Sequence, residues 1–147
     1  MLLPGLLFAG LVACSDSSDT PPVAPSSLTI VANAVPEGAP GEMPTLRFRI
    51  TLDLPQSRPV NVNFQTAGVT ATAGEDYLDT VGDVSIPAGA LEAFIPVDVL
   101  GDADEEAAET FTLNYSVNGN AVATENATTG TIANDDTACD APFELTE

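Results

Sequence analysis

The sequence contains no histidine, lysine or tryptophan, and only two cysteines among its 147 residues. Its positive charge comes from three arginines, which face 22 aspartates and glutamates and leave a net charge of −19. Nucleic-acid binding requires Lys or Arg against phosphates, so this balance argues against a nucleic-acid partner and against attraction to anionic lipid. Without histidine, the chain lacks the commonest general base and transition-metal ligand, and two cysteines cannot form a four-thiolate zinc site. Any bound metal is therefore expected to be a hard cation that prefers oxygen.

The first 13 residues form an apolar run that ends at Cys14. A span of the bilayer needs about 20 apolar residues, so we interpret residues 1–13 as a signal peptide. The stretch Leu11-Val12-Ala13-Cys14 resembles the lipobox of bacterial lipoproteins, in which small residues precede a lipidated cysteine. Cys14 is thus the expected lipidation site, and the lipid is the expected contact with the membrane. The alternative is an ordinary secretory peptide with an incidental cysteine; both predict export, and the lipobox predicts attachment to the bacterial cell envelope, at the outer membrane or cell surface.

Two segments flank the region that has a regular pattern. Residues 14–27 are rich in Ser, Asp and Pro and are expected to form a flexible tether. Residues 137–147 have no strand pattern and are expected to form a loose tail, in which Cys139 has no evident partner.

Alternation of apolar and polar residues dominates the chain between residues 28 and 136. In residues 46–52, LRFRITL, the apolar side chains recur at every second position, which is typical of a half-buried strand. Seven runs of this kind are predicted strands, at residues 28–35, 44–54, 60–66, 81–86, 91–100, 110–117 and 120–132. Seven short alternating strands predict an all-β fold, a seven-stranded antiparallel immunoglobulin-like β-sandwich.

The acidic residues are distributed unevenly over the connections between these strands. If successive strands alternate in direction, the connections after the first, third and fifth strands lie at the same end as the exit from the seventh. The twelve acids in those four segments are Glu37, Glu42, Glu75, Asp76, Asp79, Asp102, Asp104, Glu105, Glu106, Glu109, Asp135 and Asp136. The connections at the other end, residues 55–59, 87–90 and 118–119, contain no acid. Two like charges about 5 Å apart near a surface cost roughly 3 kcal/mol, so a multivalent cation is expected, and Ca²⁺ suits oxygen ligands from several loops best.

Five stretches resemble, in order, those of the Calx-beta domain family, which occurs in sodium–calcium exchangers and many bacterial surface proteins. They are VPEG (35–38), TATAGEDY (70–77), IPAGALEAFIPVDV (86–99), DADEEAAETF (102–111) and TTGTIANDD (128–136). The resemblance implies a sandwich domain over residues 28–136 that binds Ca²⁺. The calcium ligands that it implies are Glu37, Asp76, Asp102, Asp104, Glu106, Glu109, Asp135 and Asp136.

Two positions depart from the family pattern. Gly101 stands where the family often has the first of two aspartates, and Gly68-Val69 stands where Asp-Gly is usual. The first departure removes one possible ligand and predicts fewer ions or weaker binding.

Tyr77 is expected to be a packing residue rather than a ligand.

The leading functional hypothesis is a non-enzymatic calcium-binding module, tethered to the cell envelope and facing outward for adhesion to a surface protein or glycan. The alternatives are a calcium-dependent carbohydrate or cell-surface binder, and a passive spacer without bound ion. A glycosidase that uses two carboxylates is disfavoured by the small domain, the missing histidine and the grouping of the acids as in a metal site.

Overall fold

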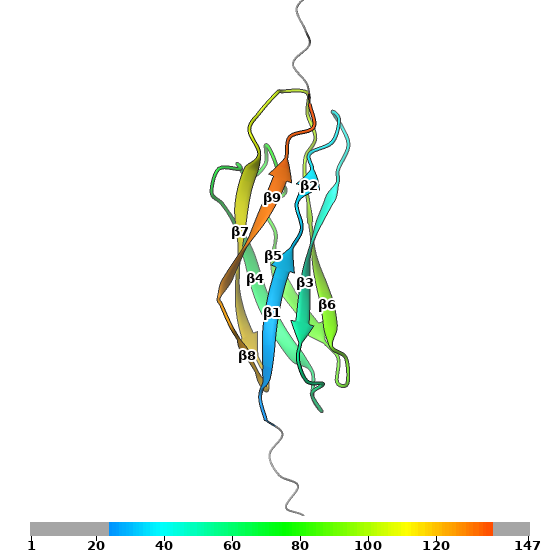
Figure 1. Ribbon diagram of the computed structural model, residues 1–147, viewed down its shortest axis with the longest axis vertical. Helices are drawn as coiled ribbons and strands as arrows, with labels where there is room; N and C mark the ends of the chain where they lie inside the picture. Colours follow the sequence, from blue (N-terminus) through cyan, green and yellow to red (C-terminus); the bar gives the residue numbers. More distant parts are fainter. Residues whose placement is uncertain (1–23, 137–147) are drawn as a thin grey trace, which may run out of the picture.

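A computed structural model describes residues 24–136 as two β-sheets packed face to face (Figure 1). Its strands are β1 (Ser26–Ala32), β2 (Val35–Pro36), β3 (Thr45–Leu52), β4 (Val60–Gly68), β5 (Val81–Ile86), β6 (Glu92–Asp98), β7 (Glu109–Asn118), β8 (Ala121–Ala123) and β9 (Ala127–Ala133). Among these described residues there is no helix long and apolar enough to cross a membrane. The predicted signal peptide, most of the predicted tether and the predicted tail lie outside the described residues, as do Cys14 and Cys139.

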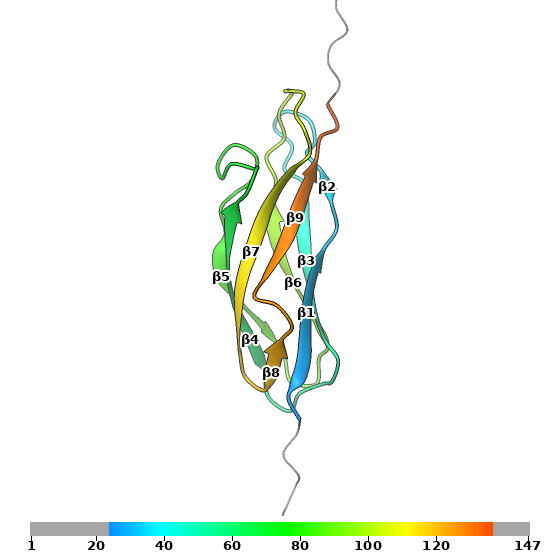
Figure 2. The ribbon, with the colours of Figure 1, turned by 60° about the vertical axis from the view of Figure 1, so that its left-hand side comes forward.

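The predicted all-β sandwich is confirmed, but two of the seven predicted strands are each divided between the sheets. One sheet has the order β6-β3-β1-β8, and the other has the order β2-β9-β7-β4-β5. The chain crosses from the first sheet to the second between β1 and β2, and again between β8 and β9 (Figure 2). As a result, β1 pairs with β8 and β2 with β9 in parallel, whereas the other strand pairs are antiparallel.

The alternating pattern of β3 builds the core as predicted. Leu46, Phe48, Ile50 and Leu52 are all buried, because side chains two residues apart point to the same face of a strand. The intervening Arg47 and Arg49 lie on the solvent face, where Arg49 pairs with Glu92 of β6. This ion pair is exposed, so it contributes little to stability.

An aromatic group joins the two sheets near one end of the sandwich. The ring of Phe111 meets that of Phe48 edge-on at 5.9 Å and stacks on that of Tyr77 at 4.4 Å. Gly130 of β9 provides the space, because a Cβ there would lie 2.9 Å from Phe111 and 3.0 Å from Phe48. Tyr77 is fully buried, so its predicted role as a packing residue is confirmed.

The two ends of the sandwich differ as the alternation of strand direction predicted. β1 starts at one end, whereas β9 finishes at the other, beside the connections β2–β3, β4–β5 and β6–β7 (Figure 1). One detail of the prediction is wrong: β3 ends at Leu52, so Asp53 belongs to a connection at the end that was expected to hold no acid. The Asp53 carboxylate accepts hydrogen bonds from Ser26 Oγ (2.6 Å) and from the Ser27 N–H (2.7 Å), and these bonds lower the pKa of Asp53. Asp53 therefore anchors the start of β1.

Candidate metal site

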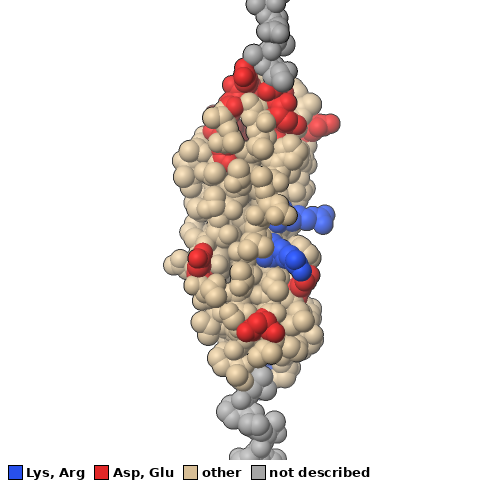
Figure 3. Space-filling view, in the orientation of Figure 1, with Lys and Arg blue, Asp and Glu red and all other residues tan. Residues whose placement is uncertain are grey.

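Acidic side chains crowd the end of the sandwich at which β9 finishes. Figure 3 shows red acidic atoms crowded at that end, with a few more red groups lower on the same face, whereas most of the blue arginine atoms lie near the middle. We call this end the acidic pole and define it by four segments: Glu37 after β2, the β4–β5 connection with Asp76, the β6–β7 connection from Asp102 together with Glu109 at the start of β7, and Asp135-Asp136 after β9.

Glu37 is the most deeply buried carboxylate of the acidic pole. It lies directly after β2, where its N–H donates to the Ala133 carbonyl of β9 at 2.9 Å. The next N–H, that of Gly38, donates to Asp135 Oδ1 at 2.9 Å, so the backbone on both sides of the Glu37 side chain is fixed. The residue is only 3% exposed, and its Oε1 has no hydrogen-bond partner among the described residues. A buried carboxylate oxygen without a partner is costly unless a cation approaches it.

Three further carboxylates form a tight cluster. Oxygens of Asp76, Glu106 and Glu109 all lie within 4.8 Å of one another. Asp76 is buried and is held by the Thr72 N–H, which donates to its Oδ2 at 2.6 Å. Glu109 opens β7 half-buried, and its Oε2 is buried without a hydrogen-bond partner among the described residues. Glu106 is exposed and reaches the cluster from the β6–β7 connection.

Asp136 and Asp102 complete the acidic surroundings of Glu37. Asp136 Oδ2 is another buried oxygen that has no partner in the described part of the chain. Asp102 Oδ1 accepts the Asp104 N–H at 2.7 Å, which closes a turn at the start of the acidic connection. The charges of Asp102 and Asp136 both raise the pKa of Glu37, so both carboxylates act on the same site.

The pKa values show that burial and mutual repulsion disfavour the ionised form of these carboxylates. Burial, followed by the charges of Asp102, Glu106, Asp136 and Asp76, raises the pKa of Glu37 from 4.5 to about 7. Burial and the neighbouring Asp76 carboxylate raise the pKa of Glu109 from 4.5 to about 7 as well. The pKa of Glu106 is also raised, first by desolvation and then by Asp76. Because these groups shift one another, they behave as one site rather than as separate surface acids.

Two of the predicted ligands, Asp135 and Asp104, do not join the group of carboxylates around Glu37 and Asp76. Asp135 is exposed and uses one oxygen to hold the Gly38 N–H. Asp104 is also exposed; its N–H holds the Asp102 carboxylate, and its charge raises the pKa of Glu106. The residues that converge are Glu37, Asp76, Asp102, Glu106, Glu109 and Asp136.

The supporting residues were not predicted from the sequence. Thr72 fixes Asp76, and Asn134 accepts the Asp136 N–H at 2.7 Å while its amide donates to the Glu106 carbonyl. Asn134 thus ties the segment after β9 to the β6–β7 connection. The spacing of Asn134 two residues before Asp136 is a signal of such a turn, since Asn side chains accept backbone N–H groups two positions later.

The donor set fits a hard divalent cation. All converging side chains are carboxylates, and three of them carry a buried oxygen with no partner in residues 24–136: Glu37, Glu109 and Asp136. Carboxylates from four separate segments suit Ca²⁺, which accepts six to eight oxygens in flexible geometry, better than Mg²⁺, which requires a near-ideal octahedron.

Comparisons with known proteins agree with this fold. Residues 42–136 match the Calx-beta domain as a sequence family. Among solved structures, the apo form of the Calx CBD1 domain is 23% identical, with a TM-score of 0.59 over 74% of this chain and 98% of that one. The calcium-binding domain CBD12 of CALX1.1 is also 23% identical, with a TM-score of 0.64. That match covers 76% of this chain and 47% of the CBD12 chain. The Calx CBD2 domain is 14% identical, with a TM-score of 0.55 over 72% of this chain and 85% of that one. A search of curated proteins gave no match.

Proposed function

This chain belongs to the Calx-beta domain family, and from that premise we propose that it is a non-enzymatic module that binds Ca²⁺ at the acidic pole. The observation that carries the proposal is the set of buried carboxylate oxygens without partners on Glu37, Glu109 and Asp136. These residues come from three segments that are far apart in the sequence, and a shared cation explains why they meet. The similar CBD12 structure is described as a calcium-binding domain, which supports the choice of ion.

The chain's own residues hold the ligands in place before any ion arrives. Asp135 and the Ala133 carbonyl fix the backbone around Glu37, the Thr72 N–H fixes Asp76, and Asn134 fixes Asp136. When bound, Ca²⁺ would supply the positive charge that offsets the mutual repulsion of these carboxylates. Because the ligands belong to four segments, relief of that repulsion favours one arrangement of the whole acidic pole. The proposed role of the ion is therefore to order the loops at this end and the surface that they present.

We also propose that the module is anchored to the bacterial cell envelope through a lipid on Cys14 and that the acidic pole faces away from the membrane. The first described residues lie at the opposite end of the sandwich from the acidic pole, which is compatible with this orientation (Figure 1). A surface that is ordered by calcium and directed outward suits adhesion to a surface protein or glycan.

Isothermal titration of the chain with CaCl₂ tests the proposed ion site. We expect saturable binding that Glu37→Gln weakens at least about tenfold, or 1.4 kcal/mol, because the substitution removes one charge-bearing ligand. Glu42→Gln is the matched control: Glu42 lies in the same connection, but it is exposed and its Oε2 accepts only the Ala39 N–H, which Gln can also accept. Absence of Ca²⁺ binding, or equal Ca²⁺ binding by the Glu37 and Glu42 variants, would contradict the proposal.

The anchor has its own test. Labelled palmitate should be incorporated when the chain is expressed in a bacterium, and Cys14→Ser should abolish the incorporation. Labelling that persists in the Cys14 variant would exclude this cysteine as the lipidation site.

A further inference from the structure

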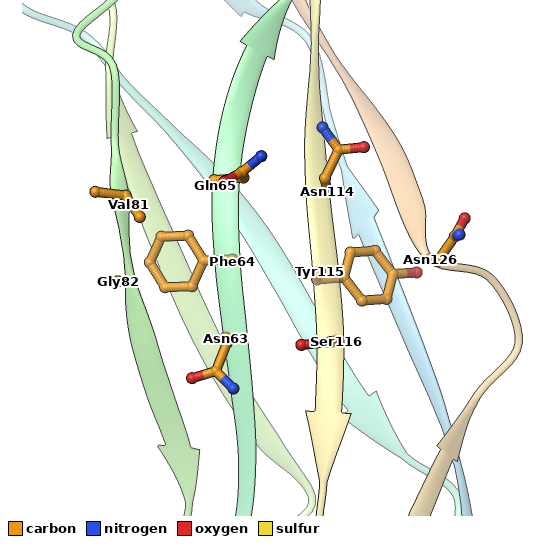
Figure 4. A pocket seen from close by; sticks show the side chains of 9 residues that line it. All are labelled: Asn63, Phe64, Gln65, Val81, Gly82, Asn114, Tyr115, Ser116 and Asn126. Carbon is orange, nitrogen blue, oxygen red and sulfur yellow. The ribbon is translucent and has the colours of Figure 1, made fainter.

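A shallow hollow lies across the five-stranded sheet, away from the acidic pole. Its volume is about 540 Å³, and its lining residues come from β4, β5, β7 and the connection that precedes β9 (Figure 4). Asn63, Gln65, Asn114, Ser116 and Asn126 supply polar side chains to it. None of its nine lining residues is charged, although the chain carries a net charge of −19.

The amide side chains of the hollow are unusual for their place in the fold. β4 and β7 are central strands, and Asn is depleted from strands because it neither packs well on a pleated surface nor resists competing turn conformations. Yet Gln65 lies beside Asn114, and Asn63 beside Ser116, in the register of these two strands. Strand stability does not explain this choice of residues, since Thr or Val would favour the strand more.

The polar side chains of the hollow are available to a ligand. No hydrogen bond joins the side chains of Asn63, Gln65, Asn114 and Asn126 to another group in the described part of the chain, and Figure 4 shows these residues among those that line the hollow. Each amide offers a carbonyl acceptor and two N–H donors, and a serine hydroxyl offers both functions. The hollow therefore presents a dense, uncharged set of donors and acceptors.

A second hollow continues the first. It has a volume of about 600 Å³ and shares Tyr115, Ser116 and Asn126 with it. The two hollows adjoin at these shared residues, and the second one also contains Glu125. This arrangement suits an extended ligand better than a compact one.

The chemistry of the lining selects among the classes of ligand. Nucleic acids and other polyanions need cations, of which the first hollow has none. Phe64, Val81 and Tyr115 also give the hollow an apolar part, but five of its nine lining residues are Asn, Gln or Ser, whose polar groups a purely apolar ligand would leave unpaired.

An extended peptide usually adds to an exposed sheet edge, and β5, which contributes Val81 and Gly82, is such an edge. Asn63, Gln65 and Asn114 lie instead on β4 and β7 where both strands pair with a neighbour on each side, so strand addition at the edge would not use them. A chain of sugar hydroxyls, each both donor and acceptor, matches the amides and the serine.

We propose that this hollow binds a neutral oligosaccharide and that it does so without a metal ion. The site is independent of the acidic pole, because none of its lining residues belongs to that pole. It differs in this respect from a sugar ligated directly to calcium, and its failure would leave the proposed calcium site untouched.

Titration of the ¹⁵N-labelled chain with neutral oligosaccharides, followed by NMR, tests the site, because side-chain amide signals of Asn and Gln are observed directly. The probes are the hexaoses of β-1,4-glucose, α-1,4-glucose, β-1,4-N-acetylglucosamine and α-1,6-mannose, each to about 10 mM, a concentration that detects millimolar affinity. We expect at least one probe to shift the side-chain signals of Asn63, Gln65 and Asn114 saturably, with the same affinity in EDTA and in Ca²⁺.

Matched variants separate the hollow from the rest of the sheet. Asn63→Ala combined with Asn114→Ala should weaken binding at least tenfold, or about 1.4 kcal/mol. Asn61→Ala should not, because Asn61 lies on β4 two residues outside the lining. The proposal is overturned if no probe shifts these signals, if shifts are confined to the acidic pole, or if binding requires Ca²⁺.

Discussion

Glu37 combines two properties that an ordinary structural residue does not have. It is almost fully buried at the end of a strand, and one of its oxygens has no hydrogen-bond partner in residues 24–136. The rise of its pKa from 4.5 to about 7 corresponds to roughly 3 kcal/mol by which the folded protein disfavours the ionised form. Such a cost is expected where a residue serves a ligand rather than the stability of the free fold.

Asp135 lies where it can position the backbone beside Glu37 without binding the ion itself. Its Oδ1 accepts the N–H of Gly38, the residue after Glu37. Asp135→Asn keeps an oxygen that can accept this bond, so we expect nearly unchanged Ca²⁺ affinity, whereas Asp135→Ala should weaken affinity and cost about 1 kcal/mol of stability. Calorimetry and hydrogen exchange of the Gly38 amide would measure both effects.

The comparison variant is Asp136→Asn. Asp136 has a buried oxygen without a partner in the described residues, so loss of its charge should weaken Ca²⁺ binding more than loss of the Asp135 charge does. Equal losses in the two variants would instead make Asp135 a ligand, as the family resemblance implies.

At the scale of elements, the β2–β3 connection packs backbone to backbone against the start of the β6–β7 connection. The Gly101 N–H donates to the Glu42 carbonyl at 3.2 Å, and the Gly41 N–H donates to the Gly101 carbonyl at 3.4 Å. A Cβ at residue 101 would lie 2.4 Å from the Gly38 carbonyl oxygen and 2.6 Å from that of Ala39. In this arrangement a glycine at residue 101 is required by close packing, and a side chain there would displace one connection.

Gly101→Ala should therefore weaken Ca²⁺ binding although it removes no carboxylate. The added methyl group would push the β2–β3 connection, and with it Glu37, away from Asp102. We expect an affinity loss of about tenfold or more, measured by calorimetry. Ala107→Ser, an exposed change in the same acidic connection, should leave the affinity unchanged. Wild-type affinity in Gly101→Ala would show that the contact does not position the site.

The elements differ in how far the sequence could predict them. The alternation of β3 and β7 follows from burial of one face, so their core residues were predictable. The division of the first and last predicted strands was not, because the run of residues is continuous and only the pairing across sheets reveals the crossing. From the sequence, Gly101 was interpreted as a lost ligand, because the close approach of two backbones at this residue cannot be recognised from the sequence alone. Convergence of the acids was predictable from strand direction alone, but the roles of Thr72 and Asn134 depend on turn geometry.

At the scale of the whole molecule, the segregation of acids to one end makes stability depend on pH. Glu37 and Glu109 have folded pKa values of about 7, above the 4.5 of an unperturbed glutamate. As pH rises, the unfolded chain releases these protons first, so without a cation the folded state loses stability between about pH 4.5 and pH 7. Asp53, whose pKa is lowered, acts in the opposite sense only at lower pH.

Urea unfolding in EDTA should therefore give a lower unfolding free energy at pH 7.5 than at pH 5. The difference should be reduced in a Glu37→Gln, Glu109→Gln double variant, and saturating Ca²⁺ should reduce or reverse it because the ion favours the ionised carboxylates. An unfolding free energy in EDTA that stays constant or increases over this pH range would contradict the coupling described for these residues.

Thermal unfolding of the chain in EDTA, in Ca²⁺ and in Mg²⁺ tests the central claim, that the acidic pole is a calcium site, most directly. An ion that binds only the folded state at about one hundred times its Kd adds about 2.7 kcal/mol, which for a domain of this size raises Tm by on the order of 10 °C. The account predicts such a rise in Ca²⁺, a much smaller one in Mg²⁺, and a calcium effect reduced by about half or more in Glu37→Gln. A Tm that is the same in EDTA and in millimolar Ca²⁺ would contradict it.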